Sequence, residues 1–151
     1  MCVLRAAGAD FDVDAFLATS SLKAISVRRK GELRLTTKPD GPRHERSGFT
    51  ADVSLKEWND LPGQIEDAKA FLAEHGAELL RLRSFGGIGG MELDFPVHLR
   101  IGMNQIVVQG DRLPADLLLA AGRVGVDIVI TIYPPPNEGE SPPSTSPGGT
   151  V

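Results

Sequence analysis

Cysteine is almost absent from this sequence, because Cys2 is the only one among 151 residues. A single cysteine excludes an internal disulfide framework and a zinc site built on cysteine ligands. It is also typical of a reducing compartment. Aromatic residues are scarce as well, at 5% of the chain. We therefore expect an aliphatic core built from Leu, Val, Ile and Ala.

Long hydrophobic runs are missing too. The longest apolar stretches lie near 117–121 and 128–133, and both are much shorter than the roughly 20 residues of a membrane-spanning helix. The start of the chain carries no basic segment ahead of an apolar one, which is unlike a signal peptide. These absences predict a cytoplasmic protein with no membrane partner.

The chain also lacks an overall excess of positive charge. Its net charge of −4 argues against a general nucleic-acid binder. Residues 23–46 differ, since they hold eight basic and three acidic residues and leave the rest of the chain at −9. No aromatic residue lies among these charges to stack on a base. The stretch is either a solvated strand pair with its loop or a dock for an acidic partner protein.

Motifs for catalysis and for metal binding are absent. No Gly-x-Ser-x-Gly sequence presents a nucleophile, and Cys2 lies in an expected strand. The three histidines form no His-x-x-His pair of the kind that holds zinc. The acidic residues of 10–14 lack the glycine and glutamate of a calcium loop, and Asp12 or Asp14 fits a helix N-cap instead. We therefore expect neither an enzyme nor a cofactor or metal site.

Hydrophobic periodicity predicts seven strands and three helices. The strands are expected at 3–8, 24–27, 49–55, 80–85, 91–101, 106–109 and 128–133, and the helices at 15–18, 62–76 and 117–120. Gly76 is a natural end for the second helix, and Pro96 predicts an edge or a bulge for its strand. The order favours an α+β fold, in which three helices pack on one face of a mostly antiparallel sheet. We expect a ferredoxin-like arrangement or an elaboration of one.

The two ends of the chain resemble each other. Gly8 and Asp14 recur as Gly110 and Asp116 at one constant offset, and each set lies in a strand–loop–helix–strand pattern. This predicts a β-α-β unit at each end of one domain. We expect that domain over 1–133. Residues 134–151 are rich in Pro, Gly and Ser, which predicts a disordered tail.

Several segments together resemble a family of uncharacterised small bacterial proteins, known only as a domain of unknown function. They are the Gly-Ala-Asp-Phe-Asp-Val-Asp stretch of 8–14 ahead of a short helix, Trp58, the helix of 62–76, and the close of 119–133. Members often carry a Leu-Gly-x-x-Pro turn after the first helix, and residues 17–21 lack it. The resemblance implies no activity and no catalytic residue.

A glycine run at 85–90 is the most prominent local motif. With Arg81 and Arg83 close before it, the run is compatible with a loop whose free N–H groups bind an anion. It does not open a predicted helix, as a phosphate-binding glycine loop must, so a plain hairpin connection is the other interpretation. The candidate ligand-binding residues are Arg81, Arg83, Gly86, Gly87 and Gly89.

Two functions from different classes follow. The first is a non-enzymatic interaction module, such as a bacterial immunity or accessory protein, that docks an acidic partner through Arg28, Arg29, Arg34 and Trp58. Trp58 is either an exposed anchor for that partner or a lid on the core. The second is a small-ligand-binding regulatory domain with its site at the glycine run. Exposed sheet edges are also compatible with a homodimer.

Overall fold

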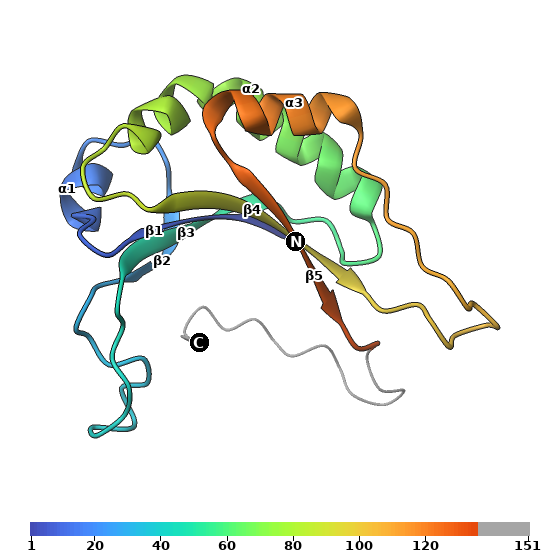
Figure 1. Ribbon diagram of the computed structural model, residues 1–151, viewed down its shortest axis with the longest axis horizontal. Helices are drawn as coiled ribbons and strands as arrows, with labels where there is room; N and C mark the ends of the chain where they lie inside the picture. Colours follow the sequence, from blue (N-terminus) through green and yellow to red (C-terminus); the bar gives the residue numbers. More distant parts are fainter. Residues whose placement is uncertain (136–151) are drawn as a thin grey trace.

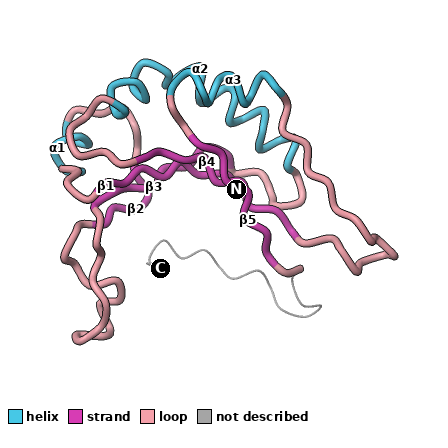
Figure 2. Tube along the Cα trace, in the orientation of Figure 1, coloured by secondary structure: helices cyan, strands magenta, loops and turns pink. Residues whose placement is uncertain are grey.

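The computed structural model describes residues 1–135, which form five strands and three helices (Figure 1, Figure 2). In chain order the elements are β1 (Cys2–Gly8), α1 (Val13–Ala18), β2 (Ala24–Arg28), β3 (Ser47–Ser54), α2 (Leu61–Arg83), β4 (Gly90–His98), α3 (Ala115–Val124) and β5 (Asp127–Tyr133).

The five strands form one sheet in the order β2-β3-β1-β4-β5. The central strand β1 runs antiparallel to β3 and to β4, and β2 runs antiparallel to β3. At the other edge β5 is parallel to β4. A parallel pair needs a crossover connection, and the segment that contains α3 supplies it. The predicted α+β class with a mostly antiparallel sheet is confirmed.

Helices α2 and α3 lie over one face of the sheet, and α1 lies at one end of it (Figure 1). An ion pair of 2.8 Å between Lys69 of α2 and Asp116 of α3 joins the two longer helices. Helix α1 begins after Asp12, whose carboxylate accepts a hydrogen bond from the Ala15 N–H. This is the N-cap that the acidic residues of 10–14 predict.

The core lies between the helices and this covered face of the sheet. Leu4 in the middle of β1 is flanked by Ala51 of β3 and Leu93 of β4, and all three are buried. At the α1 end of the sheet the rings of Phe16 and Phe49 stack with their centroids 5.9 Å apart. Four phenylalanines thus pack together at this end of the core, while Phe95 is buried in β4.

Helix α2 is longer than the sequence pattern predicts. The expected end at Gly76 is wrong, and the helix continues to Arg83. A Cβ at position 76 would meet nothing within 4 Å, so the glycine fills an open position on the helix surface. The predicted strand at 80–85 is wrong for the same reason. Leu79 and Leu82 are both fully buried, and their spacing of three residues follows the helical period.

The predicted strand at 106–109 is also wrong. These residues are irregular, and Val107 is 83% exposed. The C-terminal β-α-β unit uses β4 as its first strand instead, so the chain does carry such a unit at each end of the fold. The two units are not equivalent, since β3 lies between β1 and β2 while β4 and β5 are direct neighbours.

Pro96 lies in β4, which is an interior strand, so the expected edge position is wrong for that strand as a whole. The pairing of β4 with β1 reaches only Asp94, opposite Val3. Beyond that point β4 pairs with β5 alone, through Pro96 and Thr131 among others. The missing N–H of the proline therefore costs no bond to β1.

The predicted tail at 134–151 lies outside the described residues, apart from Pro134 and Pro135. Within residues 1–135, no helix has the length and the apolar character needed to cross a bilayer.

Candidate functional site

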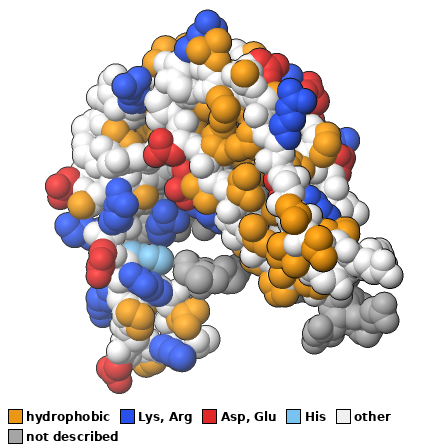
Figure 3. Space-filling model, turned by 45° about the vertical axis from the view of Figure 1, so that its right-hand side comes forward, with side chains coloured by type: hydrophobic (Ala, Val, Ile, Leu, Met, Phe, Trp, Pro, Cys, Tyr) orange, Lys and Arg blue, Asp and Glu red, His pale blue; other side chains and the backbone are white. Residues whose placement is uncertain are grey.

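Among residues 1–135, no helix covers the face of the sheet opposite α2 and α3, which we call the open face, and two long irregular segments flank it. We call residues 29–46, between β2 and β3, the basic arm, and residues 99–112, which lead from β4 toward α3, the apolar arm. Figure 2 shows the two arms as long loops on opposite sides of the sheet. In Figure 3, Lys and Arg side chains gather on the side of the basic arm, and hydrophobic side chains gather on the other side.

A hollow of about 290 Å³ lies on the open face. Three arginines from different parts of the chain line it: Arg5 of β1, Arg28 at the end of β2, and Arg46 at the end of the basic arm. Gly89 and Gly90 line it without contributing a side chain. The remaining lining residues are Ala7, Met91, Glu92 and Asp127. We call this site the arginine hollow.

Strand register explains why the surface is hollowed here. Arg28 of β2 pairs with Gly48 of β3, Gly48 pairs with Ala7 of β1, and Ala7 pairs with Gly90 of β4. Three adjacent strands therefore present only glycine or alanine in one row across the sheet. Larger side chains in that row would fill the space. The Gly48 position also tolerates no Cβ, which would lie 2.3 Å from the carbonyl oxygen of Ala6.

The charges in the hollow are only partly compensated. Burial is the main cause that lowers the pKa of the Arg28 guanidinium, and the positive charges of Arg5 and Arg46 lower it further, while Glu92 opposes them. Within residues 1–135, no acidic side chain forms an ion pair with Arg28 or Arg46. Arg46 donates a hydrogen bond of 3.3 Å to the carbonyl oxygen of Ala7. The hollow thus presents two guanidinium groups that have no anionic partner in the part of the chain that the structure describes.

Arg5 differs from the other two arginines because carboxylates already hold it. Its Nη1 lies 2.6 Å from Asp94 and 3.6 Å from Glu92. The Asp94 side chain is only 4% exposed, and it also accepts a hydrogen bond of 2.5 Å from the Thr131 hydroxyl. This network fixes Arg5 on the open face. Asp127 adds a second acidic group beside Glu92 at the β5 side of the hollow.

The four residues predicted to bind a partner do not form one cluster. Arg28 lines the arginine hollow. Arg29 donates two hydrogen bonds of 2.8 Å to the carboxylate of Asp14, and Arg34 is exposed on the basic arm. Trp58 follows the end of β3 that is opposite to the hollow. The two ends of this eight-residue strand are about 25 Å apart.

Trp58 packs against the sheet at that end. It is partly buried, and its ring stacks on Tyr133 with centroids 4.5 Å apart and lies 5.3 Å from the ring of His98. Both partners come from the paired ends of β4 and β5. This geometry agrees with the lid interpretation, and a role in binding stays a prediction.

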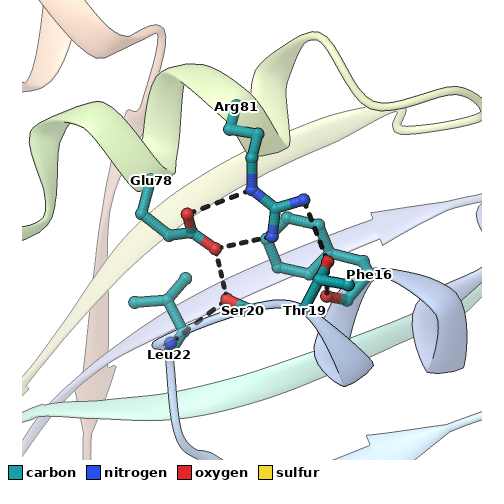
Figure 4. Close-up of polar contacts among 6 residues, drawn as sticks. All are labelled: Phe16, Thr19, Ser20, Leu22, Glu78 and Arg81. Atoms are coloured by element: carbon teal, nitrogen blue, oxygen red, sulfur yellow. Dashed lines mark hydrogen bonds and ion pairs between the residues drawn. The ribbon is translucent and has the colours of Figure 1, made fainter.

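The predicted ligand-binding arginines lie away from the hollow. Arg81 donates to both carboxylate oxygens of Glu78 and to the Thr19 hydroxyl, and its guanidinium lies 4.4 Å from the centroid of the Phe16 ring (Figure 4). Arg83 packs against the backbone of Gly125. Both arginines belong to the last turn of α2, and neither lines the hollow.

The glycine run divides in the same way. Gly89 lines the hollow, whereas Gly86 and Gly87 do not. Gly87 has a φ of +83°, and a Cβ there would lie 2.0 Å from the carbonyl oxygen of Asp10. The run is a close-packed connection from α2 to β4. Sequence reasoning missed Arg5, Arg46 and Gly90, and the one available signal was the outward position of Arg5 between the inward Leu4 and Ala6.

No group of three or more His, Cys, Asp or Glu side chains in the described part of the chain is placed to hold a metal ion. Comparison of the chain with protein families, with curated proteins and with solved structures found no match. The arginine hollow is therefore assessed on its own geometry.

Proposed function

We propose that this chain is a non-enzymatic interaction module, of the bacterial immunity or accessory kind, that docks an acidic partner protein on the open face of its sheet. A carboxylate of the partner enters the arginine hollow. The observation that carries the proposal is the convergence of Arg5, Arg28 and Arg46 on one hollow, in which two of the three have no ion-pair partner among residues 1–135.

An anionic group is the natural occupant of this hollow. A guanidinium binds a carboxylate through two parallel hydrogen bonds, which makes the pair stronger and more specific than a contact with a lysine. A bound carboxylate would also offset the mutual repulsion of the three arginines, which lowers the pKa of Arg28 in the free protein. Glu92 and Asp127 on the other side of the hollow set the direction from which an anion approaches.

The size and surroundings of the hollow favour a side chain of a larger partner. Its volume of about 290 Å³ is at the low end for a pocket that buries a whole small molecule. The two arms beside it offer a much longer surface, cationic on one side and apolar on the other (Figure 3). A free carboxylate or phosphate compound is the second candidate, because Gly89 and Gly90 leave the hollow accessible.

We further propose that the fold is an elaborated ferredoxin-like fold in a cytoplasmic protein. The first six elements follow the order β-α-β-β-α-β of that fold, and each of their four strands is antiparallel to its neighbours. Helix α3 and strand β5 are then an addition at the β4 edge.

The test is to fill the hollow from within. A Cβ at Gly90 meets nothing within 4 Å, so Gly90→Glu can add a side chain at this position and bring a carboxylate to the arginines. Gly86→Glu is the matched control, since its Cβ also meets nothing and it lies outside the hollow. Tagged wild-type and variant proteins are used to capture partners from the native lysate at low and high salt.

We expect one acidic protein to be captured by the wild type and by Gly86→Glu, lost with Gly90→Glu, and lost from the wild type at high salt. Equal capture by Gly90→Glu would contradict the proposal. An empty capture together with a rise in wild-type melting temperature on addition of phosphate or citrate, absent in Gly90→Glu, would establish the small-ligand alternative instead.

A further inference from the structure

The two edges of the sheet differ in how well they are protected against pairing with another strand. Strand β2 at one edge has five residues and a register shift between Ala24 and Ser26, and the basic arm follows it directly. Irregularity and charge are the usual means of protecting an edge. Strand β5 at the other edge has seven residues in unbroken register with β4. Within residues 1–135, β5 pairs with β4 alone, so one side of its backbone has no strand partner.

An exposed apolar surface continues from this unprotected edge. Ile132 and Tyr133 at the end of β5 are 55% and 36% exposed. The N–H of Leu99 donates to the carbonyl oxygen of Tyr133 at 2.7 Å and so joins the apolar arm to β5. The exposed large hydrophobic residues of that arm are Ile101, Met103, Val107 and Val108. Figure 3 shows hydrophobic side chains gathered on this side of the molecule.

We propose that β5 pairs edge to edge with β5 of a second copy of this chain, in antiparallel orientation about a two-fold axis, with the apolar arms packed beside the pair. With the axis near Ile130, Ile128 lies opposite Ile132 of the partner subunit. The two sheets then form one continuous sheet, and the exposed apolar surface of each copy meets its equivalent, as a two-fold interface requires.

A second copy fits this edge better than an unrelated partner because the edge is complementary to itself. The one charged side chain of β5 is Asp127. An axis at Ile130 places it opposite Tyr133 of the partner subunit, so pairing the strand with its own copy brings no like charges into opposition. Five of the six residues at 128–133 are Ile, Val or Thr, in unbroken succession at 128–132, and β-branched residues suit a paired strand. The arginine hollow lies on the sheet face and reaches β5 only at Asp127, at the other end of the strand from Ile132 and Tyr133, so the inference does not rest on the proposed function.

The oligomeric state of the full-length chain tests the inference. We expect the wild type to show twice its chain mass of 16.1 kDa in sedimentation equilibrium and in size exclusion with light scattering. Ile132→Lys places a charge in the pairing edge and should give the single chain mass at the same concentration. Ile25→Lys is the matched control, because Ile25 is 49% exposed on the opposite edge strand, and it should keep the wild-type mass.

Circular dichroism melts establish that each variant is folded. If Ile132→Lys does not fold, Val107→Lys is used instead. The Val107 side chain is 83% exposed on the apolar arm, so its replacement should not disturb the packing of the core. Hydrogen exchange is the second readout, and the β5 amides should exchange faster in the edge variant than in the wild type. A wild type that stays at the single chain mass up to its solubility limit would overturn the inference. A dimer that neither Ile132→Lys nor Val107→Lys dissociates would overturn it as well.

Discussion

The carboxylate of Glu78 joins α2 to the turn that follows α1. It accepts hydrogen bonds of 2.7 and 3.1 Å from Arg81 and one of 2.5 Å from the Ser20 hydroxyl (Figure 4). The bond from Arg81 is the main cause that lowers the pKa of Glu78, and the bond from Ser20 adds to it. A carboxyl group whose pKa is lower in the folded chain stabilises the fold only while it is ionised.

Glu78→Gln should therefore lower the free energy of unfolding at neutral pH and lose this effect in acid. The advantage of the wild type is complete above the ordinary glutamate pKa of 4.5. It disappears as the pH falls through the lowered pKa of the folded state. Urea denaturation of both proteins between neutral pH and pH 3 measures the difference. Glu74→Gln is the control on the same helix, because that side chain is 77% exposed, and a difference that does not depend on pH would contradict the argument.

At the scale of the element, replacing two glycines by alanine should change the free energy of unfolding in opposite directions. Gly76 lies inside α2 with open space around it, and Gly125 caps α3 at a φ of +73°. We expect Gly76→Ala to raise the free energy of unfolding by about 1 kcal/mol, because alanine restricts the unfolded chain and favours the helix. Gly125→Ala should lower it by about 1–2 kcal/mol, because the left-handed conformation disfavours a side chain. Thermal and urea unfolding measure both changes, and a destabilised Gly76→Ala would show that the glycine has a packing role.

The elements with clear local patterns are those that the sequence predicts correctly. The first strand, the β3 strand and the last strand all lie within two residues of the predicted 3–8, 49–55 and 128–133. The stretch at 80–85 is different, because the alternation of Leu and Arg is compatible with a strand and also with a helix. The choice depends on which residues pack against Leu82, and the local sequence does not show this. The stretch at 106–109 has the composition of a strand, but it pairs with no strand among residues 1–135. Strand pairing joins residues that are far apart in the sequence, so local periodicity does not predict it.

At the scale of the whole molecule, the arginine hollow shows the same limit. Arg28 was predicted as a binding residue because it lies in a basic stretch, but its neighbours in the hollow come from β1 and from the end of the basic arm. Only the register of four strands places Arg5, Arg28 and Arg46 together. Proximity in the sequence pointed instead to Arg81 and Arg83, whose side chains contact Glu78 and Gly125. The local sequence therefore indicates a positively charged site, but it does not indicate which arginines meet there.

The order of strands in the sheet also predicts which backbone amides are best protected against hydrogen exchange. Strand β1 is central and pairs residues near the start of the chain with 47–54 and with 90–94, so its amides are released only when the sheet as a whole separates. We expect the slowest hydrogen exchange at Leu4 and Ala6, faster exchange in the shifted edge strand β2, and the fastest in the basic arm. Exchange of β1 should not depend on protein concentration, whereas exchange of β5 should slow as the concentration rises and copies pair. Amides of β2 that are as protected as those of β1 would show that the sheet is not the cooperative unit of the fold.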